Sequence, residues 1–149
     1  MNKEAIFFSV KSTEESTGFL LWQLTNLWQR EIKKSLEPLG LTHSQFVLLA
    51  SIHWLTIQKK DVTQVLLSNH TKIDPMTTST VLRTLQKKEF LKRQEHLTDT
   101  RAKTVILTDK GTKTIKKAIK IVEKFDTVFF AKLKSHLNVF NKNIVLLLT

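Results

Sequence analysis

Apolar residues recur three or four positions apart along most of this 149-residue chain, the spacing expected of amphipathic helices. The pattern predicts helices over residues 14–37, 42–55, 61–69, 74–88, 108–133 and 135–148. Two further runs, 90–95 and 103–107, are expected to be extended, and the second is β-branched and apolar. The predicted fold class is therefore mainly α with one small β-hairpin.

Local side-chain chemistry marks where three of these helices begin. Thr42 can cap the second helix, and Gln45 can reach back to complete a capping box. Asp74 can cap the fourth helix, with Pro75 at the first helical position, where a missing N–H costs nothing. Thr108 can cap the fifth helix. These caps indicate at which residues the three helices begin.

That order is the one found in a winged helix-turn-helix. The third helix has two candidate caps, Asp61 and Thr63, and a turn at 70–73 joins it to the fourth. In such a motif the second helix of the pair lies in the major groove of DNA, and the hairpin forms the wing. With 3 Gly and 2 Pro, the chain shows no flexible boundary, so residues 1–149 are expected to form one domain.

The charge composition predicts a polyanionic partner. The formal net charge is +11, and residues 83–124 hold 13 Lys/Arg against 5 Asp/Glu. Charge concentrated in one stretch favours double-stranded DNA as the partner, although a solvated lysine-rich helix face accounts for part of it. No run approaches the roughly 20 apolar residues that span a membrane, and no signal peptide is seen. A cytoplasmic location, without a membrane, is the expectation.

Helical phasing separates the core side of the fourth helix from its outward side. Thr78, Val81, Leu82 and Leu85 share one stripe and are expected to face the core. Thr and Ser hydroxyls, a methionine and an arginine on the other side suit base edges and phosphates. The residues expected to contact DNA are Pro75, Met76, Thr77, Ser79, Thr80, Arg83, Thr84, Lys87, Arg101 and Lys103.

The wing contributes the last two of these residues. Asp99 is expected to hold Arg101 in position across the tight turn, because a carboxylate does not itself bind phosphate. The alternative to DNA contact is that these residues form a polar helix surface and a solvated hairpin. Lys113, Lys116, Lys117, Lys120 and Lys124 share one face of the fifth helix, and a solvated face is the simpler account of them.

Aromatic residues raise the question of a ligand. Trp22, Trp28, His53 and Trp54 either line an effector cleft for a small aromatic or anionic molecule or pack in a dimer core. The five histidines show no metal-ligand spacing, and no cofactor motif is present. An enzyme is not expected, because the chain has no Cys, no Gly-rich phosphate loop and no convincing carboxylate pair.

The spacing of several motifs resembles the MarR family of bacterial transcriptional regulators. The matching runs are Leu-Thr-x-x-Gln-Phe at 41–46, Val-Thr-Gln at 62–64, Asp-Pro-Met-Thr-Thr-Ser at 74–79, Leu-Gln-Lys-Lys at 85–88, Arg93, Asp-Thr-Arg-Ala at 99–102 and Leu-Thr-x-x-Gly at 107–111. The resemblance implies a DNA-binding lobe over 41–112 and dimerisation helices over 1–40 and 113–149. It also implies a homodimer on pseudo-palindromic sites, usually a repressor, often released by a small, commonly phenolic anion.

The chain departs from the family pattern at three places. Glu89 stands where glycine is usual at the end of the recognition helix, so an unchanged backbone would carry strain of roughly 1 kcal/mol. Leu66 replaces a common acidic residue, which favours Asp61 as the cap of the third helix. The wing tip at 96–98 is less basic than in many members.

These observations favour a sequence-specific DNA-binding transcriptional regulator. The alternative is a nucleic-acid-associated or protein-binding adaptor that keeps the fold without reading sequence. Equal affinity for specific and scrambled DNA would favour the alternative. Operator sequence, target genes and the identity of an effector are not encoded in any motif of the chain.

Overall fold

A computed structural model of the chain describes residues 7–95, 98 and 103–149. Its helices are α1 (Thr17–Leu36), α2 (His43–Ile57), α3 (Gln64–Thr71), α4 (Pro75–Lys87), α5 (Asp109–Phe130) and α6 (Leu137–Leu148). Strands β1 (Leu91–Glu95) and β2 (Lys103–Leu107) pair antiparallel, and short 3-10 turns cover Thr13–Glu15, Glu37–Leu39 and Ala131–His136. The expected fold class, mainly helical with one hairpin, is confirmed.

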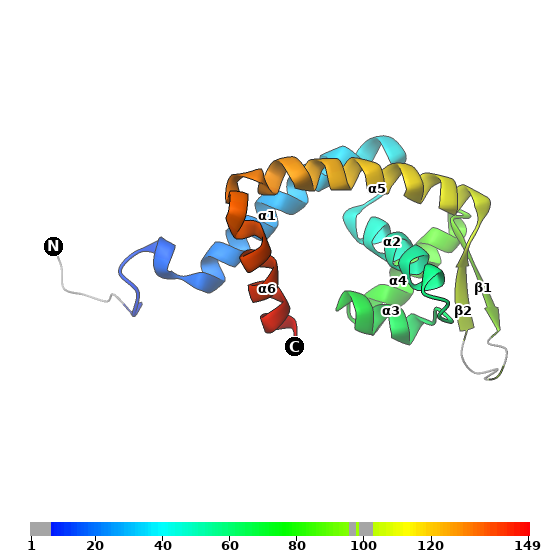
Figure 1. Ribbon diagram of the computed structural model, residues 1–149. Helices are drawn as coiled ribbons and strands as arrows, with labels where there is room; N and C mark the ends of the chain where they lie inside the picture. Colours follow the sequence, from blue (N-terminus) through cyan, green and yellow to red (C-terminus); the bar gives the residue numbers. More distant parts are fainter. Residues whose placement is uncertain (1–6, 96–97, 99–102) are drawn as a thin grey trace.

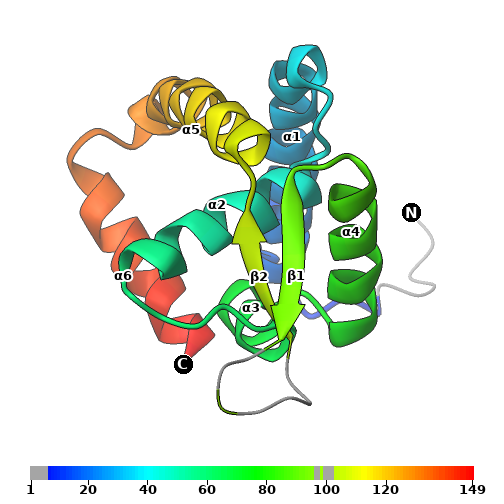
Figure 2. The same ribbon diagram turned by 90° about the vertical axis from the view of Figure 1, so that its right-hand side faces the viewer.

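The elements form two groups bridged by α5 (Figure 1). One group holds α2, α3, α4 and the hairpin, and the other holds the beginning of α1 together with α6. Seen from the hairpin side, α4 stands beside β1 and α3 lies below (Figure 2). No helix in the described ranges is long and apolar enough to cross a membrane.

The core is centred on α2. Its buried residues include Leu48, Leu49 and Ile52, all fully buried, and they meet Ile32 and Leu36 of α1. The remaining core side chains are Leu41, Phe46, Leu55, Val62, Leu67, Leu82, Leu85, Phe90, Leu91, Val105, Ile115, Ala118 and Val122. The apolar residues of α2 therefore find partners on several sides, apart from Trp54 and Ile57 near its end, which are exposed.

Side-chain caps begin the helices as their sequence predicts. The backbone N–H of Gln45 donates to Thr42 Oγ1 at 3.2 Å, and that of Thr42 donates to Gln45 Oε1 at 3.1 Å, a complete capping box. Thr77 N donates to Asp74 Oδ1 at 2.8 Å, and Gly111 N donates to Thr108 Oγ1 at 3.0 Å. These bonds satisfy N–H groups that have no partner within the helix.

The third helix corrects the prediction. It begins at Gln64, and Thr63 caps it by accepting from Leu66 N at 3.1 Å, so of the two candidate caps Thr63 is confirmed and the preference for Asp61 is wrong. The reason is a strand contact: Val62 O accepts from Val105 N at 2.8 Å, and Thr63 forms a bridge with Thr104. Backbone that extends along a sheet edge cannot also form the first turn of a helix.

The recognition helix ends with Glu89 at φ 63°, in the left-handed region. Glu89 N donates to Gln86 O at 3.0 Å and Phe90 N to Leu85 O at 3.0 Å, the bond pattern of a Schellman motif. Phe90 and Leu85 are both buried, which completes the motif. The backbone is therefore the one that glycine usually supplies, and Glu89 is strained as expected.

The last two helices differ from their predicted bounds by a few residues. Helix α5 ends at Phe130, and the 3-10 segment that follows contains Lys134 at φ 49°. Helix α6 then begins at Leu137 and has no buried residue. The sequence predicted a break between these helices at about residue 134, but apolar periodicity did not predict the 3-10 segment that fills it.

Candidate nucleic-acid interface

Helix α4 presents one face to solvent. Thr78, Leu82 and Leu85 are fully buried, as the phasing predicts, whereas Val81 is half-buried. On the outward side Met76 is 79% exposed, Pro75, Thr77, Thr80, Arg83 and Lys87 are exposed, and Ser79 and Thr84 are half-buried. The structure thus brings all eight candidate residues of α4 to its outer side, where they can meet a partner.

Hydrogen bonds within the protein determine which hydroxyl groups on this face can still donate to a partner. Thr77 Oγ1 donates to Asp74 Oδ2 at 2.6 Å, Thr80 Oγ1 to Met76 O at 3.1 Å and Thr84 Oγ1 to Thr80 O at 3.2 Å. These three threonine hydroxyls already donate within the protein, so towards a partner each threonine has only an acceptor lone pair and a methyl group. The Ser79 hydroxyl makes no hydrogen bond among the described residues, so it is free to donate.

The carboxylate of Asp74 already occupies the N-terminus of α4. Hydrogen bonds from the Thr77 hydroxyl and then the Thr77 backbone hold the pKa of Asp74 below its usual value. This carboxylate takes up the N–H of Thr77 that a phosphate would otherwise find at a helix N-terminus. Recognition at this end is therefore suited to base edges and thymine methyls more than to phosphate.

The turn between α3 and α4 fixes where the outward face points. Ser68 Oγ donates to Ile73 O at 2.6 Å, and Gln64 Nε2 donates to Pro75 O at 3.3 Å. Thr78 Oγ1 donates to Asp74 O at 2.9 Å, which ties the buried threonine to the same turn. Side chains of α3 thus position the start of the recognition helix.

The far end of α4 is held by two lysines. Lys88 Nζ donates to Gly40 O at 2.9 Å and to Gln45 Oε1 at 3.2 Å. Lys110 Nζ donates to Lys88 O at 2.9 Å and lies 5.0 Å from the centre of the Phe90 ring. Lys88 is therefore a structural residue, whereas its neighbour Lys87 is exposed. Charge alone gave no means of separating these two lysines in the sequence.

The hairpin offers a second exposed basic surface. Lys92 of β1 pairs with Ile106 of β2, and both are exposed, as is Lys103. Lys92 was not among the sequence candidates, although strand alternation from buried Leu91 could have placed it outward. Arg93, the next residue, has Nε and one Nη buried without a hydrogen bond in the described part of the chain. The expected wing contacts Asp99 and Arg101 lie outside the described residues.

A hollow of about 710 Å³ lies between α1, the start of α2 and the α3–α4 turn. Its lining includes Trp28, Arg30, Lys33, His43, Thr71 and Ile73. Of the four residues expected in an effector cleft, only Trp28 lines it. Trp22 and Trp54 are 68% and 56% exposed, and His53 is half-buried. The structure therefore does not bring the four together.

Trp28 and His43 meet at this hollow, and Trp28 also bonds to Asp126, which is not part of the lining. Trp28 Nε1 donates to Asp126 Oδ1 at 2.8 Å, and the Trp28 and His43 rings meet edge-on with centres 5.0 Å apart. Burial lowers the pKa of His43, and the charge of Asp126 partly opposes this. The result is an aromatic surface, and Arg30 and Lys33 in the same lining supply its positive charge. The described residues contain no group of three or more potential metal ligands.

Comparison with known proteins places the chain among winged-helix regulators. The model of the ArnR1-like, winged-helix domain family matches residues 37–124. The chain is 43% identical over 116 residues to YdcH of Bacillus subtilis, an uncharacterised HTH-type transcriptional regulator, with 78% of this chain and 79% of YdcH covered. It is 28% identical over 116 residues to the HTH-type transcriptional repressor Rv2887 of Mycobacterium tuberculosis, with 78% and 81% covered.

Solved structures share the fold over most of its length. MepR of S. aureus in complex with DNA has a TM-score of 0.81 at 21% identity, covering 92% of this chain and 97% of MepR. A MarR-family regulator from Rhodococcus sp. RHA1 also scores 0.81, at 18% identity, covering 93% and 96%. CouR from Rhodococcus jostii RHA1, bound to p-coumaroyl-CoA, scores 0.79 at 18% identity, covering 91% and 93%.

Proposed function

Because the chain belongs to the MarR family of winged-helix DNA-binding transcriptional regulators, we propose that it represses transcription as a homodimer bound to a pseudo-palindromic operator. The observation that carries this proposal is the outward face of α4, where polar and methyl groups stand exposed on a helix whose opposite face is buried. In a helix-turn-helix this face meets base edges in the major groove.

Each part of the interface has a distinct proposed role. Met76 and the threonine methyl groups pack on thymine methyls, while Ser79 and Arg83 donate hydrogen bonds to bases or phosphates. Lys87, Lys92 and Lys103 contact phosphates and make affinity depend on salt. Pro75, Thr77, Thr80 and Thr84 complete the helix face in the groove. Arg101, oriented by Asp99, is proposed to reach the minor groove from the wing.

The homodimer is proposed from the apolar surface left on α1 and α6. Leu21 and Trp22 of α1 are 60% and 68% exposed, and Leu146 and Leu147 of α6 are 71% and 81% exposed. Single exposed apolar residues are ordinary, but a helix without one buried residue, such as α6, indicates a missing partner. A second copy of the chain supplies it, and Trp22 then belongs to the dimer core.

A small aromatic anion is proposed as the effector that releases DNA. Trp28 and His43 offer an aromatic surface, and Arg30 and Lys33 offer positive charge in the same hollow. Ile73 lines the hollow and directly precedes Asp74, the cap of α4. A ligand that binds one arrangement of this turn more tightly than another shifts the recognition helix between two positions.

Selection of bound DNA from a random pool tests the proposal. The expected result is an enriched two-fold symmetric sequence, with half-sites about one helical turn apart. Fluorescence anisotropy should then show a preference of about 1,000-fold or more over a scrambled duplex at the same salt. Equal affinity for both duplexes would instead favour an adaptor that does not read sequence.

The Arg83→Ala and Lys103→Ala variants separate the two kinds of contact. Loss of a base contact at Arg83 should cost about 1–3 kcal/mol and relax preference at one position of the site. Loss of the phosphate contact at Lys103 should weaken specific and scrambled DNA alike and reduce the salt slope by about 1. The reverse pattern would show that these two roles are wrongly assigned.

A further inference from the structure

Five lysines of α5 form a basic row that the proposed operator contacts do not use. They are Lys113, Lys116, Lys117, Lys120 and Lys124, and all are exposed. At 3.6 residues per turn their mean direction lies roughly 170° from that of buried Gly111, Ile115, Ala118 and Val122 on the same helix. This basic row therefore points away from the protein interior.

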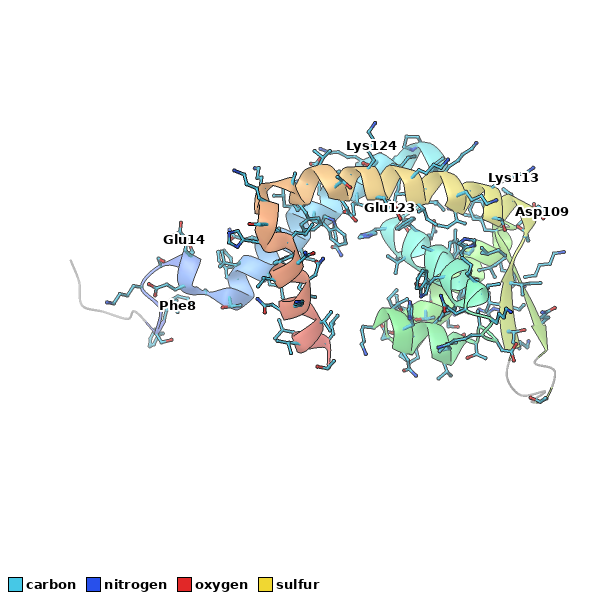
Figure 3. All side chains as sticks on the ribbon, viewed as in Figure 1. Phe8, Glu14, Asp109, Lys113, Glu123 and Lys124 are labelled. Carbon is cyan, nitrogen blue, oxygen red and sulfur yellow. The ribbon has the colours of Figure 1, made fainter. Side chains whose placement is uncertain are left out.

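The basic row also points away from the recognition helix. The buried face of α5 packs on α1, α2 and β2, and α3 and α4 lie beyond α2. Figure 3 shows Lys113 and Lys124 along the outer edge of α5, opposite the side on which α3 and α4 lie. A duplex held by the outward face of α4 cannot at the same time lie along this row.

The lysines of the row repel one another, and the carboxylates at neighbouring helix positions are two, Asp109 four residues before Lys113 and Glu123 three residues after Lys120. Each has another lysine of the row three or four residues away, a spacing at which like charges destabilise a helix. Elsewhere a carboxylate relieves such charge, as where Glu31 lies 3.2 Å from Lys34. Among the side chains that the structure describes, no carboxylate lies within 4.0 Å of any ammonium group of the row. Five lysines against these two carboxylates leave the face strongly positive.

We propose that the basic row of α5 binds the phosphate backbone of a second DNA segment, so that the protein bridges two duplexes. The row spans about 16 Å along a rigid helix. B-DNA carries one phosphate charge per roughly 1.7 Å of axis, so a continuous line of ammonium groups meets a continuous line of phosphates. A linear, single-sign array suits DNA better than a folded acidic protein, whose carboxylates are scattered. The proposal rests on operator binding by α4 and adds a second, sequence-blind contact.

A two-duplex capture experiment tests the bridge. Operator duplex fixed on a surface is saturated with the full-length protein and washed, and an unrelated fluorescent duplex is then added. We expect capture of the second duplex that falls about 500-fold between 50 and 200 mM salt, as five phosphate contacts require. Replacing all five lysines with glutamine should reduce capture at least about tenfold. The matched variant with five arginines keeps the charge and should retain capture.

The loading step measures operator binding separately from bridging. Both variants should load the operator with affinity within about threefold of the natural protein, because the row lies off that interface. Capture that survives in the glutamine variant would overturn the proposal, and so would a parallel loss of operator loading. Polyglutamate that binds the row more tightly than the second duplex would assign it to an acidic protein. Absence of operator preference in every variant would refute the proposed function alone, since the variants can still be compared on an unrelated duplex.

Discussion

Replacing Glu89 with glycine should stabilise the folded protein. Glu89 holds φ at 63°, a region that costs a residue with a Cβ about 1–2 kcal/mol. Glycine removes this cost but gives the unfolded chain more freedom, which returns about 0.4–1 kcal/mol. The Glu89 carboxylate makes no hydrogen bond or ion pair within the described residues, so its removal forfeits no contact. The net expectation is a gain of about 0.5–1 kcal/mol.

Urea unfolding at a fixed protein concentration measures this change, with a rise in melting temperature of about 2 °C as a second readout. Glu89→Ala is the matched control, because it removes the same charge but keeps a Cβ in the left-handed region; it should leave stability nearly unchanged. Gly40→Ala probes the opposite case. Gly40 has φ 67°, and a methyl group added there would meet no other atom within 4 Å, so alanine should cost about 1 kcal/mol through backbone conformation alone.

The comparison between glycine and alanine at position 89 decides the reasoning. If Glu89→Ala stabilised the protein as much as Glu89→Gly, relief of charge repulsion would be the cause, and the backbone argument would be wrong. If neither variant changed stability, the greater freedom of glycine in the unfolded chain would offset the relief of strain fully, and the expected gain would be wrong.

Three further changes test other parts of the structure. Gly111→Ala should destabilise the protein by more than about 3 kcal/mol, because the new Cβ would lie 1.9 Å from Phe90 O; unchanged urea unfolding would show that α5 packs elsewhere. Thr63→Ala should cost about 1 kcal/mol by removing the cap from Leu66 N, whereas Thr63→Ser should cost little, and equal losses in the two variants would contradict the cap. Burial lowers the pKa of His43, so the unfolded chain binds more protons just below pH 6.5 and stability should fall as pH falls through that range; His43→Gln should flatten this dependence, and an unchanged pH profile would refute it.

Sequence predicted those features that depend on near neighbours. Thr42, Asp74 and Thr108 cap their helices as expected, because each cap needs only the residue three positions on. The sequence marked Glu89 as the place where the helix end is either strained or altered, and the structure has the strained, glycine-like backbone. The outward face of α4 followed from helical phasing, which is equally local.

Features that depend on distant contacts were missed. The strand contact of Val62 and Thr63 involves residues about 40 positions away, and it decides between the two candidate caps in favour of Thr63. Trp28 contacts His43 at the hollow and Asp126 beside it, and both contacts depend on how α1, α2 and α5 pack. The sequence contains these side chains, but neither its composition nor its local patterns predict that they contact one another.

The attachment of α4 at its two ends has a mechanical consequence. Its last turn is clamped by Lys88 to Gly40 and Gln45, whereas its first turn follows Ile73, a wall of the hollow. The first turn is bonded to α3 through Ser68 and Gln64, so a ligand that displaces Ile73 would move this turn together with α3 while the last turn stays in place. We therefore expect a ligand in the hollow to swing Thr77 through a larger arc than Lys87, and comparison of ligand-free and ligand-bound crystal structures measures both displacements. The end that reads bases would then leave the groove while the helix stays docked to its own protein.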